Sequence, residues 1–362
     1  MTEQTTVASF HIIAKRCIDA DGVVHGDLPE FARDREHMAA LYRLMLLTRK
    51  FDEKAVALQR TGQLGTFASS LGEEASTVAI GAALQHDDVL LPSFREQGAM
   101  LARGVTPAEL FLFWGGDERG SDFQGPRLDF PICIPVGSHA SHAAGVALAF
   151  KLRKQPRVAV CVFGDGATSK GDVYEAMNLA GAWQLPVLFV VLNNHWAISV
   201  PRSAQSGAET LAQKAIAAGF EGIQVDGNDV VAAHETVLDA LAYCRNSCRP
   251  LLIEALTYRL TDHTTSDDAG RYRDEQEVSQ RWREDPVARC REFLVRQFEW
   301  TREEEEQLIE AVAEQVESAA DDYLKSSAQS PQSQFDYLYA SLPEALYWQR
   351  AQLQGNNDEP VR

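Results

Sequence analysis

Three features are scarce in this sequence: long apolar runs, basic residues and paired cysteines. No apolar run in the 362 residues approaches the length of a membrane-spanning helix. The 34 Lys and Arg residues are outnumbered by 52 Asp and Glu residues, which gives a net charge of −18. Nucleic-acid binding requires a basic surface first of all, so this balance argues against it. We therefore expect neither a membrane nor a nucleic acid as a partner.

The few cysteines are scattered along the chain and form no disulfide-like pattern: Cys17, Cys133, Cys161, Cys244, Cys248 and Cys290. This usage is typical of buried thiols in a reducing compartment. Cys244 and Cys248 are one helical turn apart and could form half of a metal site, but no second ligand pair accompanies them. The first residues, MTEQTTVASFHIIAKR, lack the basic region and long apolar core of a secretion signal. We expect a cytoplasmic location as the default.

The most informative stretch is a βαβ pattern between residues 157 and 199. Residues 158–163 form a short apolar run typical of a buried parallel strand, and Gly164-Asp165-Gly166 follow it directly. A helical pattern and Pro186 come next, and then a second apolar strand at 187–192 ends in Asn193-Asn194. Open α/β sheets bind ligands at the carboxyl ends of their strands, so these polar residues predict a binding site.

The residue types at this site favour a hard cation. A carboxylate from Asp165, an amide oxygen from Asn194 and a nearby carbonyl suit Mg²⁺, which completes its shell with waters and phosphate oxygens. A dinucleotide fingerprint would need glycine where Ser169 stands, and a Walker loop would need Gly-Lys-Ser/Thr instead of Lys170-Gly171-Asp172. GDG alone could be a simple turn, but Asn194 at the end of the next strand favours the metal site.

The segment GDGATSKGDVYEAMNLAGAWQLPVLFVVLNNHWAISVP resembles one protein family. It is the alpha subunit of the thiamine diphosphate-dependent decarboxylating component of 2-oxo acid dehydrogenase complexes, and the likeness is greatest to pyruvate dehydrogenase. The resemblance covers residues 43–294 and implies an α/β, thiamine diphosphate-binding fold with a largely parallel sheet. It also implies thiamine diphosphate and Mg²⁺ as cofactors. The implied reaction is decarboxylation of pyruvate, a small 2-oxo acid, and transfer of the acetyl unit to the lipoyl group of an acyltransferase component.

The same resemblance assigns residues to the site. The implied magnesium ligands are Asp165, Asn194 and the carbonyl of Trp196. The implied contacts to thiamine diphosphate come from Phe94, Arg95, Ile134, Val136, Gly166, Ala167, Ile198 and His263. Within this set, Arg95, Gly166 and Ala167 meet the diphosphate, the backbones of Ile134 and Val136 hold the aminopyrimidine, and Ile198 is the wedge that bends the cofactor.

His263 is the implied catalytic residue, on a polar loop at 261–273 that orders when cofactor binds. Arg271 and Arg273 are further candidates to grip the diphosphate. Some relatives are phosphorylated on a serine of this loop, where Thr264 stands here.

Each of three other side chains can be interpreted in two ways. Phe67 is either a wall of the substrate pocket or an ordinary packed aromatic. His139 and His142 are either catalytic or packing histidines at the start of a small-residue helix.

The sequence predicts four regions: an irregular N-terminal arm at 1–33, the α/β domain at 34–295, a helical extension at 296–325, and a joint, docking segment and tail at 326–362. We expect the tail at 355–362 to be disordered. Only one α/β module is present, whereas thiamine catalysis needs a second half that supplies a carboxylate beside the aminopyrimidine. We therefore expect a beta subunit in an α2β2 heterotetramer.

Other functions remain open at this point. A branched-chain 2-oxo acid or acetoin could replace pyruvate with the same machinery. A transketolase-type half enzyme would share GDG and NN, but the segment YRLTDHTTSDD argues against it. A non-catalytic scaffold would bind no cofactor.

Overall fold

The computed structural model describes residues 2–353, which are organised around one parallel sheet. Its six strands lie in the order β1-β7-β8-β4-β3-β2. Their bounds are β1 Ala14–Lys15, β2 Val89–Leu91, β3 Ala159–Gly164, β4 Val187–Asn193, β7 Glu221–Asp226 and β8 Leu251–Leu256. A separate antiparallel pair, β5 (Trp196–Ala197) and β6 (Val200–Pro201), follows β4 directly. The expected α/β fold with a parallel sheet is confirmed.

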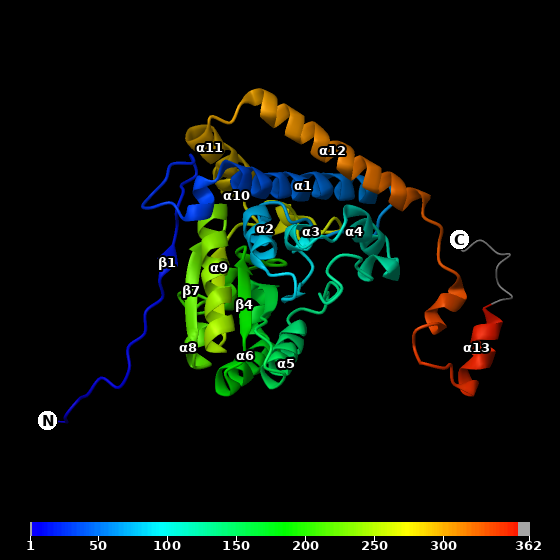
Figure 1. Cartoon of the computed structure of the whole chain (residues 1–362), viewed down its shortest axis with the longest axis horizontal. Helices are drawn as coiled ribbons and strands as arrows, with labels where there is room; N and C mark the ends of the chain where they lie inside the picture. The colour runs from blue at the N-terminus through cyan, green and yellow to red at the C-terminus, as the bar shows by residue number, and fades with distance from the viewer. Residues whose placement is uncertain (1, 354–362) are drawn as a thin grey trace.

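Helices cover both faces of the sheet (Figure 1). The larger layer contains α1 (Arg35–Arg60), α2 (Glu74–Ala83), α3 (Gln97–Ala102), α4 (Pro107–Trp114), α9 (Val230–Ser247) and α11 (Pro286–Phe298). The smaller layer contains α5 (His139–Leu152), α6 (Gly171–Trp183) and α8 (Lys214–Ala217). The short helices α7 (Arg202–Gln205) and α10 (Glu275–Arg281) belong to the loops that follow β6 and β8.

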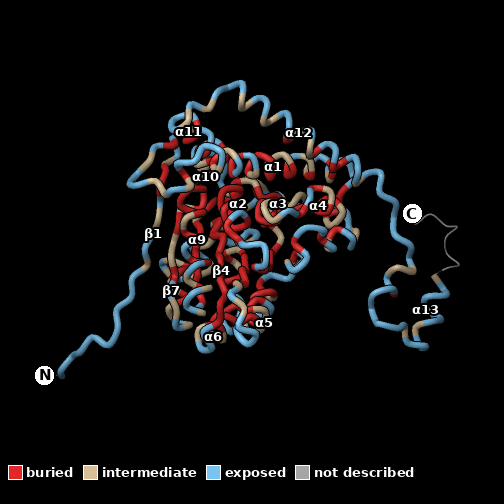
Figure 2. The backbone as a smooth tube through the Cα atoms, in the orientation of Figure 1, coloured by how far each residue is buried: buried red, intermediate tan, exposed pale blue. Residues whose placement is uncertain are grey.

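Alternate residues of the central strands point to opposite faces and fill two hydrophobic clusters. Val160 and Val162 of β3 join the larger helical layer, while Ala159, Cys161 and Phe163 join the smaller one. Strands buried on both sides carry almost no polar residues, which is why β3 and β4 are continuous apolar runs in the sequence. The buried core therefore follows these strands through the centre of the molecule (Figure 2).

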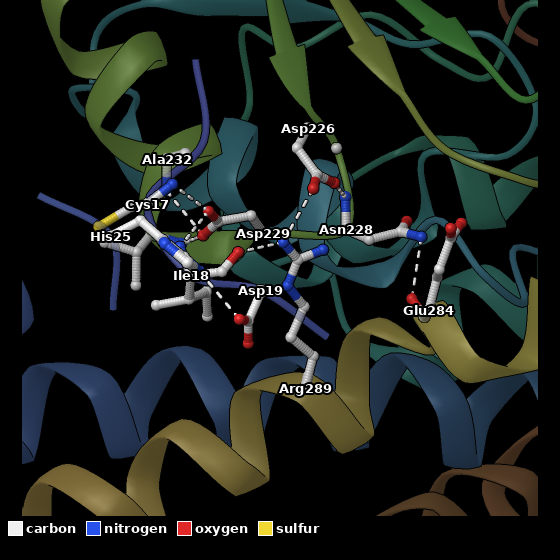
Figure 3. A network of polar contacts seen from close by, with 12 residues as sticks. Cys17, Ile18, Asp19, His25, Asp226, Asn228, Asp229, Ala232, Glu284 and Arg289 are labelled. Atoms are coloured by element: carbon white, nitrogen blue, oxygen red, sulfur yellow. Dashed lines mark hydrogen bonds and ion pairs between the residues drawn. The ribbon is translucent and has the colours of Figure 1, made fainter. Parts of the chain in front are cut away.

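The N-terminal segment, expected to be irregular, contributes the edge strand β1, which pairs with β7. A buried carboxylate holds the chain just after it: Asp229 accepts hydrogen bonds from the backbone N–H groups of Cys17 (2.6 Å) and Ile18 (2.7 Å) (Figure 3). The other oxygen of Asp229 caps the start of α9. Arg289 of α11 donates to Asp226 at 2.8 Å and also to the Ile18 carbonyl, so the network connects three distant segments. The pairing of β1 depends on these distant contacts, so local sequence carried no sign of it.

Helix α6 of the central unit is bounded by a turn at each end. Val173, Met177 and Ala180 of α6 are buried, but Trp183 is half exposed because α6 ends there and Gln184 turns the chain through a left-handed conformation. Between β3 and α6 the chain forms a short 3₁₀ turn, η3 (Asp165–Ser169), before the α-helix begins.

The C-terminal region leaves the body of the molecule. Helix α12 (Arg302–Lys325) packs along α1, and the following segment leads away to α13 (Tyr347–Gln352), which stands apart from the sheet (Figure 1). The tail at 355–362 lies outside the described residues. Among the described helices, none is both long enough and apolar enough to cross a bilayer.

Candidate active site

A cavity of about 220 Å³ opens at the carboxyl edge of the sheet. Its walls come from the ends of β3 and β4, the loop after β2, the loop before α5, the β5–β6 hairpin and the loop after β8. These segments are far apart in sequence, but parallel strands bring their carboxyl ends to one edge. The cavity is therefore where the sequence predicts a ligand.

Asp165 lines this cavity directly after β3 and is only 1% exposed. Its Oδ2 atom has no hydrogen-bond partner among the described residues. Burial raises the pKa of Asp165 to about 6 from 3.8. A buried carboxylate oxygen without a donor is unfavourable unless a cation or ligand meets it.

Asn194 enters the cavity from the end of β4, with its amide held in one orientation. Its Nδ2 donates to Oε1 of Glu73 at 2.7 Å, and its Oδ1 accepts from the backbone N–H of Trp196 at 3.2 Å. The opposite orientation would place donor against donor and acceptor against acceptor, so both contacts fix the position of Oδ1. Since a carbonyl oxygen has two lone pairs, Oδ1 can still accept one further interaction.

The two glycines of the turn act by leaving space. Neither Gly164 nor Gly166 has a positive φ, so the turn itself does not require glycine. A Cβ on Gly166 would lie 2.8 Å from the Cβ of Ala197, which indicates that the β5–β6 hairpin packs closely there. A Cβ on Gly164 would meet nothing within 4 Å, and Gly164 lines the cavity. The bare backbone of Gly164 therefore leaves room for a ligand at the strand end.

Arg95 and His263 form a bonded pair in the wall of the cavity. The Nη2 of Arg95 donates to Nδ1 of His263 at 2.8 Å and to its carbonyl at 2.6 Å, and Nη1 donates to the Ser69 carbonyl. Because arginine stays protonated, Nδ1 must be the acceptor and Nε2 must carry the proton. Burial and the nearby Arg95 and Arg259 lower the pKa of His263 to about 4. His263 is therefore neutral and has an Nε2–H to donate.

The loop around His263 is held mainly by polar contacts. The Thr265 N–H donates to the Phe67 carbonyl at 2.9 Å, and the Thr265 hydroxyl accepts from the Phe67 N–H at 3.0 Å. Asp267 accepts from the His263 N–H at 2.9 Å. Ala269 is the one buried residue among residues 261–273. Arg273 donates to the Arg259 carbonyl at 2.5 Å, while Arg271 is exposed and pairs with Asp268.

The buried Arg259 joins this loop to the β5–β6 hairpin. It donates to the carbonyls of Trp196 (3.3 Å) and Ile198 (2.8 Å) and to the hydroxyl of Tyr272 (2.9 Å). Ile198 has a φ of +57°, an unusual conformation for a β-branched residue, and its side chain is 55% exposed beside the cavity. Such an exposed, strained apolar residue is typical of a functional position rather than of a core.

The structure brings most of the sequence-derived site residues to this cavity: Phe94, Arg95, Val136, Asp165, Gly166, Ala167, Asn194, Trp196, Ile198 and His263 all line it. Ile134 is exposed in the same loop as Val136 and is not among the lining residues.

The three side chains for which the sequence left two interpretations open all pack against other residues. Phe67 is fully buried against Phe51 and Trp114, away from the cavity. His139 donates from Nε2 to the Val162 carbonyl at 2.8 Å, and His142 stacks on Phe130 at the surface. None of the three lines the cavity.

Sequence reasoning missed three buried residues of the site, Glu73, Glu96 and Arg259. Burial raises the pKa of Glu73 to about 7 and that of Glu96 to about 8. The available signals were weak: an acidic pair, Glu73-Glu74, at the start of an otherwise small and apolar helix, and one arginine three residues after the buried strand β8.

The arrangement fits a divalent cation with a diphosphate. Among residues 2–353, Asp165 has a charged oxygen without a partner, and the Trp196 carbonyl accepts one long bond, from Arg259. Asn194 adds an oriented amide oxygen. This is the all-oxygen ligand type of Mg²⁺, which retains waters and binds phosphate oxygens. Arg95 uses three of its five N–H groups on Ser69 and His263, so two are left for an anion. No group of three His, Cys, Asp or Glu side chains suited to a metal occurs among residues 2–353.

Fold and site together define an α/β protein whose ligand cavity lies at the carboxyl edge of a parallel sheet, with oxygen ligands at the ends of two neighbouring strands. The chain belongs to the dehydrogenase E1 component family, whose model matches residues 42–332.

Two kinds of curated relative are found. The pyruvate dehydrogenase E1 component subunit alpha of Mycoplasma genitalium is 39% identical over 87% of this chain and 88% of its own, and that of Staphylococcus aureus is 37% identical over 94% and 92%. The 3-methyl-2-oxobutanoate dehydrogenase subunit alpha of Mycobacterium tuberculosis is 40% identical over 91% of this chain and 88% of its own. Because this chain is about equally identical to both kinds of relative, sequence identity does not decide which 2-oxo acid is its substrate.

Proposed function

We propose that this chain is the alpha subunit of a 2-oxo acid dehydrogenase first component and binds thiamine diphosphate with Mg²⁺. One observation carries the proposal. Among the described residues, only two carboxylate oxygens are buried without a partner, Asp165 Oδ2 and Glu73 Oε2, and both residues line the same cavity. Unpartnered buried carboxylate oxygens gathered in one place are expected where a cation binds.

The residues of the cavity have distinct roles in this proposal. Asp165, Asn194 and the Trp196 carbonyl hold the cation, while Arg95 and the backbone at Gly166 and Ala167 hold the diphosphate. The bound cofactor supplies the carbanion chemistry of decarboxylation.

Two further residues act beside the cofactor. Ile198 shapes the cavity, with its backbone fixed by Arg259. His263 presents its Nε2–H to an oxygen of the reacting groups and remains neutral over the physiological pH range, since its pKa is lowered to about 4. It would assist acyl transfer to the lipoyl group by donating a hydrogen bond from this Nε2–H, which keeps its proton, to an oxygen that gains negative charge.

The proposal includes a partner chain that closes the cavity. Apolar side chains are exposed around the cavity mouth, with Ile134, Val136, Ile198 and Val200 each more than 40% exposed. Such a rim is typical of a surface covered by another protein. The described residues contain a single α/β sheet, so a beta subunit in an α2β2 assembly would supply the carboxylate beside the aminopyrimidine. The acetyl unit would then pass to a lipoyl acyltransferase component.

Pyruvate is the proposed substrate, because two relatives carry pyruvate dehydrogenase names. The proposed location of the enzyme is the cytoplasm. A branched-chain 2-oxo acid is the second candidate, because the relative from Mycobacterium tuberculosis is named for 3-methyl-2-oxobutanoate.

The test is to purify the full chain alone and with its co-expressed beta subunit. Mass spectrometry should find thiamine diphosphate in the complex, and the complex should decarboxylate pyruvate faster than 3-methyl-2-oxobutanoate. Preference for the branched acid would move the assignment to the second candidate. The chain alone should be inactive with saturating cofactor. Turnover by the isolated chain would refute the divided site and would point to Glu96 as an internal carboxylate.

A further inference from the structure

The unexplained part of the site is Glu73, which follows Gly72 at the start of α2. Gly72 has a φ of +95°, and a Cβ there would lie 2.2 Å from the Tyr258 carbonyl, so the chain is held tightly against the segment after β8. Glu73 donates its N–H to the Ser70 carbonyl at 2.9 Å and accepts from the Thr77 N–H at 3.0 Å. Its side chain therefore enters the cavity from a fixed backbone.

The carboxylate of Glu73 is bonded to no cation: the charges of the buried Arg95 and Arg259 oppose the effect of burial on its pKa, but neither arginine forms a hydrogen bond to it among the described residues. Glu73 is 1% exposed and forms no ion pair among the described residues. In contrast, its neighbour Glu74 is paired with Arg49. Oε1 of Glu73 accepts from Asn194 at 2.7 Å, which a glutamine could also do, whereas Oε2 has no partner at all. A buried unpartnered oxygen is costly unless a donor arrives from outside the chain.

We propose that Glu73 is a positioning residue for the cation of this site. Through Oε1 it holds the Asn194 amide so that Oδ1 is available to the cation, and through Oε2 it accepts a hydrogen bond from a water bound to that cation. Mg²⁺ usually keeps several such waters, and they are strong donors. This inference rests on the proposed cation and thiamine diphosphate, and it adds a residue outside the expected ligand set.

The chain offers a matched control in Glu254 of β8. Glu254 is also buried, and its Oε1 accepts from the neighbouring Asn193 at 2.7 Å. Its Oε2 is fully used by the backbone N–H groups of Leu211 and Ala212 and by Gln224. Glu254 does not line the cavity. The two Glu–Asn pairs therefore differ chiefly in the free oxygen and in access to the site.

The experiment measures Mn²⁺ binding by electron paramagnetic resonance to the complex with the beta subunit, at saturating thiamine diphosphate. Glu73→Ala should weaken Mn²⁺ binding by about tenfold to a hundredfold, the usual effect of losing a group that orients a metal ligand. Glu73→Gln, which keeps an oxygen for Asn194, should weaken it less, and Glu254→Gln should leave it unchanged. Saturating Mn²⁺ should restore decarboxylation in Glu73→Gln. Circular dichroism checks that each variant is folded.

The outcomes separate the inference from the proposed function. Wild-type Mn²⁺ affinity in both Glu73 variants would overturn the positioning role and leave the cofactor assignment intact. An equal loss in Glu73→Gln and Glu254→Gln would also overturn it, because the effect would then follow from removing any buried charge. No Mn²⁺ binding by the wild-type complex would overturn the proposed function together with this inference.

Discussion

Replacing Asp165 by asparagine should make the ligand-free chain more stable while removing its ability to bind the cation. Asp165 is 1% exposed and has one oxygen without a partner. Asparagine has nearly the same shape but carries no charge to bury. The side chain that the cation requires is therefore one that the fold alone disfavours.

The magnitude follows from the pKa of Asp165, which burial raises from 3.8 to about 6. The folded state therefore holds the proton more tightly than the unfolded state, and ionisation destabilises the fold above the folded pKa. Each pKa unit corresponds to about 1.4 kcal/mol, so the cost is about 3 kcal/mol at pH 7.5 and about 1 kcal/mol at pH 4.5. The cost disappears below the unfolded pKa. The increase in folding stability caused by Asp165→Asn should therefore be largest at neutral pH.

The assay is urea unfolding of the full chain without metal or cofactor, at pH 7.5 and at pH 4.5. Asp165→Asn should be more stable than wild type at pH 7.5 by up to about 3 kcal/mol, with a much smaller difference at pH 4.5. Asp172→Asn is the control, since Asp172 is exposed nearby on α6 and only loosely paired with Lys170. A destabilised Asp165→Asn at pH 7.5, or a gain independent of pH, would refute the reasoning. In the complex, Asp165→Asn should bind thiamine diphosphate no better with Mg²⁺ than without it, as measured by calorimetry.

Four further predictions concern the walls of the cavity and the loop around His263. Ile198→Gly should weaken thiamine diphosphate binding to the complex, while thermal unfolding shows unchanged or slightly higher stability, because glycine relieves a left-handed strain of about 1 kcal/mol; a large loss of stability would contradict this. In the α2β2 complex, limited proteolysis within 261–273 should slow when cofactor and Mg²⁺ are added, and equal rates would refute ordering of the loop. His263→Ala should reduce acyl transfer to lipoyl more than it lowers the unfolding temperature. Arg259→Lys should accelerate cleavage of the same loop, because lysine cannot reproduce the forked contacts to the hairpin and to Tyr272; wild-type cleavage would contradict that role.

The centre of the fold could be predicted from sequence because its signals are local. Strands β3 and β4 are buried on both faces, so each appears as an uninterrupted apolar run of strand length. Asp165 and Asn194 follow those runs directly, and parallel pairing places both at one edge. The neighbouring positions of β3 and β4, and the place of Asp165 and Asn194 at one edge of the sheet, thus follow from two short segments.

The remaining parts depend on contacts between distant segments. Glu73 meets Asn194 across 121 residues of chain, and nothing near Glu73 distinguishes it from Glu74, which instead pairs with Arg49. Strand β1 is only two residues long and is fixed through Asp229 rather than by an apolar pattern. Such features have no periodicity to detect, so they emerge only when the chain is folded.

The distribution of buried acids separates the scaffold from the site. Elsewhere in the described chain, buried acids are matched: Asp88 pairs with Arg245, Asp129 with Arg103, and Asp229 accepts four backbone N–H groups. Within residues 2–353, only Asp165 and Glu73 retain a buried carboxylate oxygen without a donor. Since an unmatched buried charge lowers stability, a pure scaffold would gain by replacing either residue. Their place in one cavity therefore favours a binding function over a structural one, because a cation that enters there would provide the missing partner for both.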